Sequence, residues 1–428
     1  MATECDVLII GGGPAGSTAA AVLAERGRDV VLLEKERHPR FHIGESLLPL
    51  NTAIFDRLGV REQVAALGVH KPGAEFVSDV TGGTVAFLFS EALDQTYTHS
   101  WQVPRAPFDE LLFKTASARG ATVQDGTRVT AVSFGAAGGR ARVEATGPDG
   151  ATEVWAPRFV LDASGRDTFL AGKLRRKDAN KQNNTAAVYA HFRGVERRSG
   201  DREGFISVHL ADDGWFWVIP LPDDVMSIGF VGNASVFKGR RGSGRDLLME
   251  RIARSPTVAS RMGNAEIVSD VVGTGNYSYF VDRAWGEGYL LIGDAFAFLD
   301  PVFSSGVLLA MTTGEMGADV ADTWLEKPAR GRAKAKRMER EVRHAMARLE
   351  WLVYRINKPA LRLLFMSPAN KLRMRDGLVS LLAGNLRGTR DQILPVLAFK
   401  FVYYVAATLL RTGLLKPPAP AMAPSEAA

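Results

Sequence analysis

The order of apolar and polar positions predicts that the chain opens on a βαβ unit. Residues 7–10 are a short apolar run of the kind buried in parallel sheets. Residues 11–17 predict a turn, residues 17–26 an Ala-rich helix, and residues 30–33 the next strand. A strand, a turn, a helix and a second strand in this order indicate an α/β fold.

Alternating apolar and polar positions later in the chain predict a second sheet, inserted into the first unit. The alternation, with turn signals, covers about 75–102 and about 180–275, as expected of antiparallel strands. Between these stretches, residues 108–120 have a helical pattern, and strands follow up to residue 161. We therefore expect residues 1–325 to form one domain that carries an inserted antiparallel sheet.

From residue 326 the pattern changes to long helices interrupted by prolines, so residues 326–428 are predicted to form a C-terminal helical region. Its Pro- and Ala-rich end, from Pro417, has the composition of a disordered tail. One stretch, Val396 to Leu410, is nearly all apolar. Its ~15 residues would rise ~22 Å as a helix, less than the ~30 Å hydrocarbon core of a bilayer. We therefore expect a packed or interfacial helix and no membrane span.

Composition and charge exclude several classes of protein. The 428 residues are 46% hydrophobic, which is ordinary for a soluble globular protein. The net charge of +6 is mild and concentrated after residue 326, so we expect a local basic surface and no nucleic-acid binding. Cys5 is the only cysteine, which excludes intrachain disulfides and cysteine-rich metal sites and fits a reducing compartment. No metal site is predicted, and because no signal peptide precedes the first strand, the cytoplasm is the expected location.

The basic excess includes residues 327–348, where only Glu339 and Glu341 offset many Lys and Arg residues in a helical pattern. Such a run is usually the solvated face of a helix. The alternative is a docking surface for an acidic carrier protein, which a basic helix would attract.

Glycines near the N-terminus predict a dinucleotide site. Gly11, Gly13 and Gly16 have the Gly-x-Gly-x-x-Gly spacing directly after a strand and at the opening of a helix. The glycines let the backbone approach a pyrophosphate, and the helix N-terminus offers that phosphate free N–H groups and a partial positive charge. Glu34, at the tip of the second strand, can accept hydrogen bonds from both ribose hydroxyls of an adenosine. The context therefore predicts an adenine dinucleotide.

An acidic residue late in the chain favours FAD over NAD. Residues 289–295 predict a strand and a tight turn, and Asp294 in that turn can hold a ribityl hydroxyl, which NAD lacks. Asp162 lies at another strand-to-turn crossing, expected near the pyrophosphate, and Arg105 is expected where the flavin edge would lie. Taken singly, Asp294 and Arg105 are more often a helix cap and a surface charge. Together and in this order they indicate a two-part FAD fold.

Trp215 and Trp217 are predicted to form an aromatic wall. Because they stand two positions apart on a predicted strand, their side chains project from the same face. Two Trp residues at this spacing are usually core or interface aromatics. Beside a dinucleotide site, the pair can instead decide what touches the cofactor.

Four stretches resemble the flavin-dependent halogenases, a branch of FAD proteins related to aromatic hydroxylases. They are Phe41 to Ser46, Lys71 within residues 70–74, Trp215 to Pro220, and Phe298 to Gly306, and the similarity covers nearly the whole chain. The resemblance implies the FAD-binding GxGxxG three-layer ββα Rossmann-like fold of the aromatic-hydroxylase type, with the inserted antiparallel sheet and the C-terminal helices added. The cofactor contacts expected on this basis are Gly11, Gly13, Ala15, Gly16, Glu34, Lys35, Arg40, Ile43, Gly44, Arg105, Asp162, Gly293, Asp294, Pro301 and Gly306.

The resemblance also implies a chemistry. In the family, reduced FAD (FADH2) reacts with O2 to give a hydroperoxide, chloride or bromide attacks its distal oxygen, and hypohalous acid reaches a lysine beside the organic substrate. Lys71 matches that lysine and would either form a haloamine or donate a proton to hypohalous acid. Trp215 and Trp217 would keep the aromatic substrate away from the flavin.

The halide site and the flap are assigned in the same way. Ser304, Ser305 and Gly306, at a helix start, offer hydroxyls and free N–H groups to a halide, although a plain N-cap is the alternative. Glu45 and Ser46 would be polar lining of the flap that bounds the flavin and the tunnel.

The chain departs from the tryptophan halogenases at one position. Members that act on free tryptophan carry a Glu just before the Ser-Thr-Gly of this loop, and Phe303 stands there in this chain. The catalytic base is therefore not identified, and the resemblance favours members that chlorinate phenol or pyrrole rings, some of them tethered to an acyl or peptidyl carrier protein. A separate flavin reductase would supply FADH2. Two alternatives remain open: a single-component FAD aromatic monooxygenase reduced in place by NAD(P)H, and a non-catalytic flavoprotein partner.

Overall fold

The βαβ unit predicted at the N-terminus is present in the computed structural model. β1 (Thr3–Ile10) and β2 (Val30–Leu33) are parallel neighbours, and α1 (Pro14–Glu25) connects them. The structure describes residues 2–135, 139–174, 177–179, 185–238, 242–275, 279–298, 300–386 and 388–416. The tail predicted from Pro417 lies outside the described residues.

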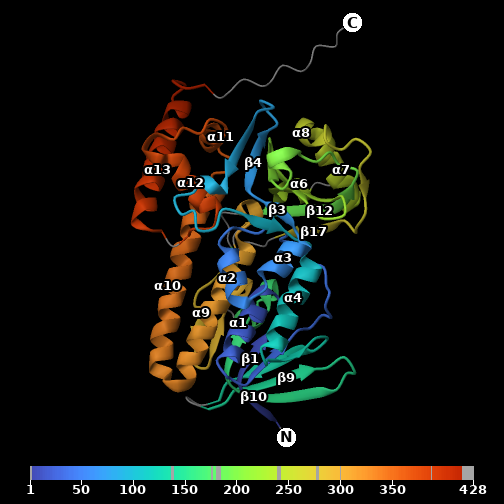
Figure 1. Cartoon of the computed structure of the whole chain (residues 1–428), viewed down its shortest axis with the longest axis vertical. Coiled ribbons are helices and arrows are strands. Elements are labelled where there is room, and N and C mark those ends of the chain that lie inside the picture. The colour runs from blue at the N-terminus through green and yellow to red at the C-terminus, as the bar shows by residue number, and fades with distance from the viewer. Residues whose placement is uncertain are drawn as a thin grey trace.

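The sheet that contains β1 is the middle of three layers. It is extended by β7 (Thr122–Gln124), β8 (Arg128–Ser133), β9 (Arg142–Thr146), β10 (Thr152–Asp162), β19 (Trp285–Gly286) and β20 (Tyr289–Leu291). The order is β19-β20-β10-β1-β2-β7, and the pairs from β20 to β7 are parallel. The first half of β10 also pairs with β9, and β9 with β8, to form an antiparallel layer on one side. Helices form the third layer (Figure 1), so the predicted three-layer ββα fold is confirmed.

Two helices pack closely in that third layer because one of them has a glycine at the contact, which leaves room for the backbone of the other. α9 (Gly306–Glu326) lies against α1, and α4 (Arg105–Ala118) lies on the other side of α1. A Cβ atom at Gly314 would lie 2.5 Å from the carbonyl oxygen of Ala15 and 3.1 Å from the Cβ of Thr18. The close approach sets where α9 lies relative to the glycine turn that precedes α1.

The predicted second sheet forms with one difference in strand direction. Its strands are β4 (Gly73–Ser78), β5 (Thr84–Leu88), β12 (Thr185–Arg193), β13 (Ile206–Ala211), β14 (Gly214–Pro220), β15 (Val225–Asn233), β16 (Glu266–Ile267) and β17 (Val272–Gly275). The order is β16-β12-β15-β14-β13-β4-β5, with β17 also paired to β12. The prediction of an antiparallel sheet is wrong at one pair, because β4 lies parallel to β13. β4 comes from an earlier part of the chain and is not joined to β13 by a hairpin.

The first inserted stretch is also shorter than predicted. Residues 100–102 form β6 (Ser100–Gln102), which pairs with β3 (Val69–Lys71) in a separate two-stranded ribbon. β11 (Lys177–Ala179), β18 (Tyr279–Val281) and β21 (Ala297–Phe298) form a small third sheet. The remaining helices of the first 260 residues are α2 (Asn51–Leu58), α3 (Arg61–Leu67), α5 (Phe169–Lys173), α6 (Ala234–Lys238), α7 (Gly244–Arg254) and α8 (Pro256–Ala259).

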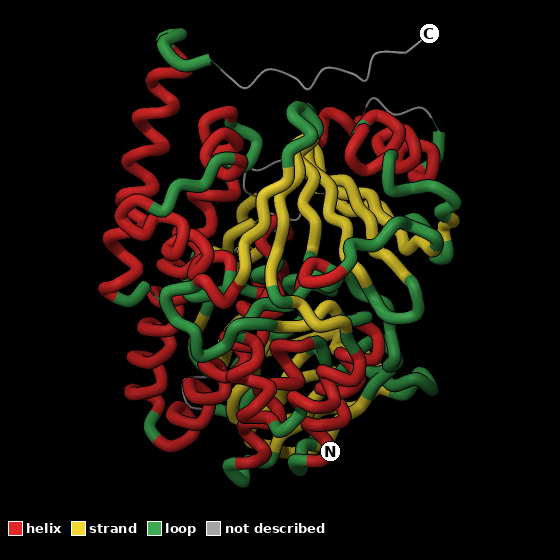
Figure 2. Tube along the Cα trace, turned by 45° about the horizontal axis from the view of Figure 1, so that its top comes forward, coloured by secondary structure: helices red, strands yellow, loops and turns green. Residues whose placement is uncertain are grey.

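The C-terminal region is helical, as predicted, and packs beside the second sheet (Figure 2). Its helices are α10 (Pro328–Val353), α11 (Pro359–Met366), α12 (Met374–Leu382) and α13 (Arg390–Arg411). α13 has 22 residues because Pro395 lies inside it and does not end it. The predicted length of ~22 Å is therefore wrong, and the helix is about 33 Å long. By length and composition alone, α13 is apolar enough to cross a membrane, although one of its faces packs against α11 and α12.

The glycine contact between α1 and α9 gives a prediction about stability. We expect Gly314→Ala to lower the free energy of unfolding by about 1–3 kcal/mol, because its methyl group would overlap the backbone of α1. The matched control is Gly172→Ala in α5, where a Cβ atom meets nothing within 4 Å. Urea unfolding followed by circular dichroism measures both changes, and equal stabilities of the two variants would contradict this packing.

Candidate functional site

One cavity of about 320 Å³ joins the glycine turn, the aromatic wall and the start of α9. It lies beyond the carboxyl ends of β1 and β2, where ligands bind in open α/β sheets. The residues predicted for the site that line it are Gly11, Gly13, Ala15, Glu34, Lys35, Arg40, Ile43, Gly44, Glu45, Ser46, Arg105, Trp215, Trp217, Asp294, Pro301, Ser304 and Gly306.

The glycine turn has the geometry that a pyrophosphate needs. Gly11 has φ +104°, and a Cβ atom there would lie 2.4 Å from the carbonyl oxygen of Ala163. A Cβ atom at Gly16 would lie 1.9 Å from the carbonyl oxygen of Gly11. No side chain caps the helix start at Gly13, so N–H groups of the first turn are left for a phosphate. The Glu34 carboxylate accepts hydrogen bonds from the backbone N–H of Gly12 at 2.7 Å and is thereby held at the rim.

Three residues predicted as cofactor contacts support the turn from behind instead of lining the cavity. The buried Asp162 carboxylate accepts hydrogen bonds from the backbone N–H groups of Ser164 (2.9 Å) and Leu170 (2.8 Å), so it shapes the loop after β10. Gly293, with φ +59°, donates its N–H to the hydroxyl of Thr313 at 2.8 Å. Gly16 admits the close turn described above. None of the three lines the cavity, and their contact with the cofactor stays a prediction.

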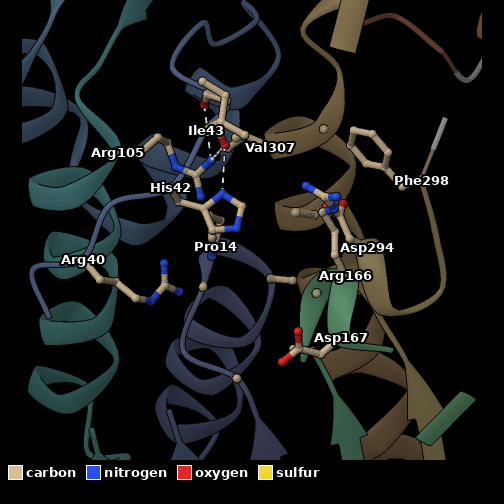
Figure 3. Close-up of a pocket in the computed structure, with 18 of the residues that line it drawn as sticks. Pro14, Arg40, His42, Ile43, Arg105, Arg166, Asp167, Asp294, Phe298 and Val307 are labelled. Carbon is tan, nitrogen blue, oxygen red and sulfur yellow. Dashed lines mark hydrogen bonds between the residues drawn. The ribbon is translucent and has the colours of Figure 1, made fainter. Parts of the chain in front are cut away.

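The part of the cavity between residues 42–46 and the start of α9 has titratable groups on two walls (Figure 3). Asp294 and Arg166 lie on one wall, and His42 and Arg105 lie on the other. Burial raises the pKa of Asp294 to about 6, against the opposing charges of Arg166 and Arg105. Burial, with the charge of Arg105, lowers the pKa of His42 to about 4, so its imidazole is neutral at physiological pH.

Arg105 has a different role from the predicted cofactor contact alone. It makes a two-point ion pair with Asp109, with distances of 2.8 and 2.9 Å, and both side chains are buried. Its Nη1 donates to the carbonyl oxygens of Ile43 at 2.6 Å and of Gly44 at 3.4 Å. Arg105 therefore ties α4 to the segment 41–47, which we call the strap.

The strap is fixed along its length to the ribbon of β3 and β6 and to the residue after β6. The carbonyl oxygen of Glu45 accepts from the N–H of Val103 at 2.7 Å, and the N–H of Leu47 donates to Trp101 at 3.0 Å. Ser46 forms an isolated β-bridge with Gln102. Because one side of the strap lines the cavity, these bonds hold it between the cavity and the ribbon.

Lys71 lies on the other side of the strap. Its ammonium donates to the Ser46 hydroxyl at 2.7 Å and to the Leu47 carbonyl oxygen at 2.8 Å, and the residue is 1% exposed. Burial lowers the pKa of Lys71 to about 7. Lys71 does not line the cavity itself, but Ser46, its hydrogen-bond partner, does.

The two Trp residues form the wall that their spacing predicts. Both are buried on β14, both line the cavity, and their ring centroids are 6.1 Å apart. The indole N–H of Trp217 donates to the hydroxyl of Ser227 at 3.1 Å. Gly229 faces Trp217 on β15, where a Cβ atom would lie 2.2 Å from the indole ring. Because Gly229 has no side chain, the indole of Trp217 can pack against β15.

Two of the three residues predicted to hold a halide line the cavity. Ser304 and Gly306 line it, whereas Ser305 is buried and does not. Ser304 has φ 55°, a conformation that costs a non-glycine residue energy and turns the chain sharply into α9. Ser305 starts the helix without a side-chain cap, and its contact with a halide stays a prediction.

His191 was missed in the sequence. Its Nε2 lies 2.6 Å from a carboxylate oxygen of Glu45, whose other oxygen is buried without a hydrogen-bond partner among the described residues. Burial disfavours the charged imidazole, but the hydrogen bond and charge of Glu45 outweigh it and raise the pKa of His191. The available signal was one polar residue at an alternate position of β12, two places from the cavity-lining Tyr189.

Comparison with known proteins first assigns the class. The family model described as "FAD binding domain" matches residues 4–314. The glycine turn, the uncapped helix start and Glu34 fit the dinucleotide part of that cofactor. The chain is a FAD-binding flavoprotein.

Halogenases are among its most similar relatives. A tryptophan 2-halogenase of Chondromyces crocatus is 34% identical over 325 residues, covering 74% of this chain and 61% of that protein. A 1H-pyrrole-2-carbonyl-(peptidyl-carrier protein) brominase of Pseudoalteromonas luteoviolacea is 33% identical over 324 residues, covering 73% and 76%. The structure of a myxobacterial chondrochloren halogenase is 26% identical with a TM-score of 0.78, covering 95% and 97%. The chain belongs to the flavin-dependent halogenase family, although it spans only 61% of the length of the first relative.

The buried amine gives a prediction about pH. Burial lowers the pKa of Lys71 from 10.5 to about 7, so between these pH values the unfolded chain binds more protons than the folded chain. This group therefore makes the free energy of unfolding rise as the pH increases from 7 to 10.5. Lys71→Met lacks that rise, and we expect its stability relative to wild type to fall with pH by up to about 1.4 kcal/mol per pH unit.

Urea unfolding between about pH 6 and about pH 10 tests this expectation. The control is Lys114→Met, because the Lys114 side chain is 71% exposed. A stability difference for Lys71→Met that does not change with pH would show that the amine is solvated.

Proposed function

We propose that the protein is an FADH2-dependent halogenase that chlorinates or brominates an electron-rich phenol or pyrrole ring. The observation that carries the proposal is Lys71, a buried amine separated from the cavity only by the strap. Reduced FAD, when bound, supplies the electrons with which O2 and a halide give hypohalous acid. The residues of the chain then determine where that oxidant reacts.

Three groups of residues divide the work in this proposal. Ser304 and Gly306, at the positive end of the α9 dipole, hold the halide. Trp215 and Trp217 keep the aromatic substrate from the flavin. Lys71 receives the oxidant, and because its pKa is about 7, both its amine and its ammonium form are populated at neutral pH. The ammonium can donate a proton to hypohalous acid, and the amine can carry the halogen.

The substrate class rests on Phe303, which is buried where tryptophan halogenases carry a carboxylate. A phenol or pyrrole ring is activated by its own heteroatom, so it needs less help from a protein base than the benzene ring of tryptophan does. One relative acts on pyrrole bound to a carrier protein by its name, and the outward side of α10 is basic. We therefore propose a carrier-bound or free aromatic substrate, a separate flavin reductase as the FADH2 source, and a cytoplasmic location.

The decisive experiment supplies reduced FAD, O2, halide and a panel of phenols and pyrroles. We expect Lys71→Ala to lose halogenated product by at least about 100-fold while still consuming O2 and releasing peroxide, because the amine acts after the oxidant forms. Lys114→Ala, which changes an exposed lysine, should behave as wild type. Retained halogenation by Lys71→Ala would show that another group handles the oxidant.

The same assay separates the alternatives. NADPH oxidation by the purified protein without a reductase, together with hydroxylated product, would identify a single-component monooxygenase. No turnover of any aromatic compound in the wild type, with or without a carrier, would favour a non-catalytic partner.

The carrier interaction has its own test. If the basic side of α10 binds an acidic carrier, then salt should slow halogenation of a carrier-bound ring more than that of the same free ring, because exposed charges are screened. Arg337 on α10 has a side chain that is 72% exposed, and Arg337→Glu should slow only the carrier-bound reaction. Equal salt sensitivity for both substrates would remove the docking surface.

A further inference from the structure

The outward face of α13 is the largest group of exposed apolar side chains on the described part of the chain. Leu394 is 74% exposed, Phe401 70%, Leu397 55%, Tyr404 51% and Val405 42%. Their spacing of three, four or one residues puts them on one side of the helix. The opposite side is formed by Gln392, Pro395, Phe399, Tyr403 and Ala406, which are buried in the protein.

α13 is thus apolar on both sides, unlike an ordinary surface helix. A surface helix normally presents polar residues to water, and a helix that is apolar all round is normally covered. Covering exposed apolar side chains is favourable because it removes their surface from water. The exposed face therefore has a strong thermodynamic reason to bind something.

The charges around this face indicate what kind of surface would bind to it. α13 begins at Arg390 and ends at Arg411, and Asp391 is its only acidic residue. Two further lysines are exposed: Lys358, which precedes the neighbouring helix α11, and Lys416, which follows α13. A second copy of the chain would bring these cations against one another. A surface that is both apolar and negatively charged complements them.

An anionic lipid surface fits better than an acidic protein. Protein interfaces contain about one hydrogen bond per 100–200 Å², whereas the side chains of Leu394, Leu397, Phe401 and Val405 have no donor or acceptor. The Tyr404 hydroxyl already accepts a hydrogen bond from the indole N–H of Trp351 at 3.2 Å. Lipid chains require no hydrogen bonds, so burial alone favours their contact with these apolar side chains.

The aromatic and basic side chains beside the exposed apolar residues of α13 are arranged as in interfacial helices. The guanidinium of Arg355 lies 4.8 Å from the Trp351 ring centroid and 5.9 Å from that of Tyr404. The Lys400 ammonium lies 5.1 Å from the same Trp351 ring. Aromatic rings with polar edges and long cationic side chains are favoured at the boundary between headgroups and acyl chains.

We propose that α13 lies in the plane of an anionic membrane surface, with Leu394, Leu397, Phe401 and Val405 in the acyl region. The protein would be peripheral, because the other face of α13 stays packed on α11 and α12. The basic residues at the helix ends contact lipid phosphates. This membrane contact is independent of the proposed halogenation.

The test is flotation of the intact flavoprotein with vesicles of phosphatidylcholine containing about 30% phosphatidylglycerol. The variant is Leu397→Glu with Phe401→Glu, and the control is Met249→Glu with Val268→Glu. Met249 and Val268 are 39% and 44% exposed. Met249 belongs to α7, which lies on the other side of the molecule from α13 (Figure 1), and Val268 directly follows β16. FAD absorbance confirms that each protein is folded, without any measurement of turnover.

We expect the wild type and the control to bind the anionic vesicles at least about tenfold more tightly than the α13 variant. Binding should weaken at about 0.5 M salt and with vesicles of phosphatidylcholine alone. Equal vesicle binding by wild type and variant, or none by wild type, would overturn the proposal. Light scattering that shows a wild-type dimer dissociated by the α13 substitutions would also overturn it, by assigning the face to a second copy.

Discussion

The burial of one ammonium group against the strap is the interaction on which the site depends. Among the described residues, Lys71 has no charged partner within hydrogen-bond distance; its ammonium donates to a hydroxyl and a carbonyl oxygen. Such a group is costly to bury, and that cost lowers its pKa to about 7. The strap must be rigid for this to hold, because a mobile strap would admit water and restore an ordinary lysine. The bonds from Arg105, Val103 and Trp101 supply that rigidity.

The same strap connects the two halves of the molecule. It leaves the first βαβ unit, passes along the cavity, and joins the ribbon that leads into β4 of the second sheet. On that sheet, the Nε2 atom of His191 lies 2.6 Å from a carboxylate oxygen of Glu45. The strap is therefore attached to α4, to the ribbon and to the second sheet at successive residues. The hydrogen bond from Lys71 to Ser46 connects the buried amine to a strap residue that lines the cavity.

Much of this arrangement follows from the sequence, because it depends on local patterns. The apolar run before Gly11 and the spacing of Trp215 and Trp217 place those residues correctly, since strand periodicity fixes which face a side chain occupies. The contact of Glu45 with His191 depends on a strand 146 residues away, and no local pattern shows it. That Asp162 and Ser305 do not line the cavity could not be predicted, because a motif gives proximity to a ligand but not the direction of a side chain. The apolar stretch was counted only from Val396, after Pro395, whereas α13 begins at Arg390 and includes the proline.

The titratable groups at the cavity and behind the strap differ in what opposes their charge. Asp294 has opposing charges in Arg166 and Arg105, and Glu45 has His191. At Asp294 burial outweighs the two guanidinium charges and raises the pKa to about 6. Lys71 differs because burial alone shifts its pKa. A buried amine without an opposing charge loses its proton more readily than an exposed one, so both forms of the Lys71 side chain are populated near neutral pH, behind the strap and outside the lining of the cavity.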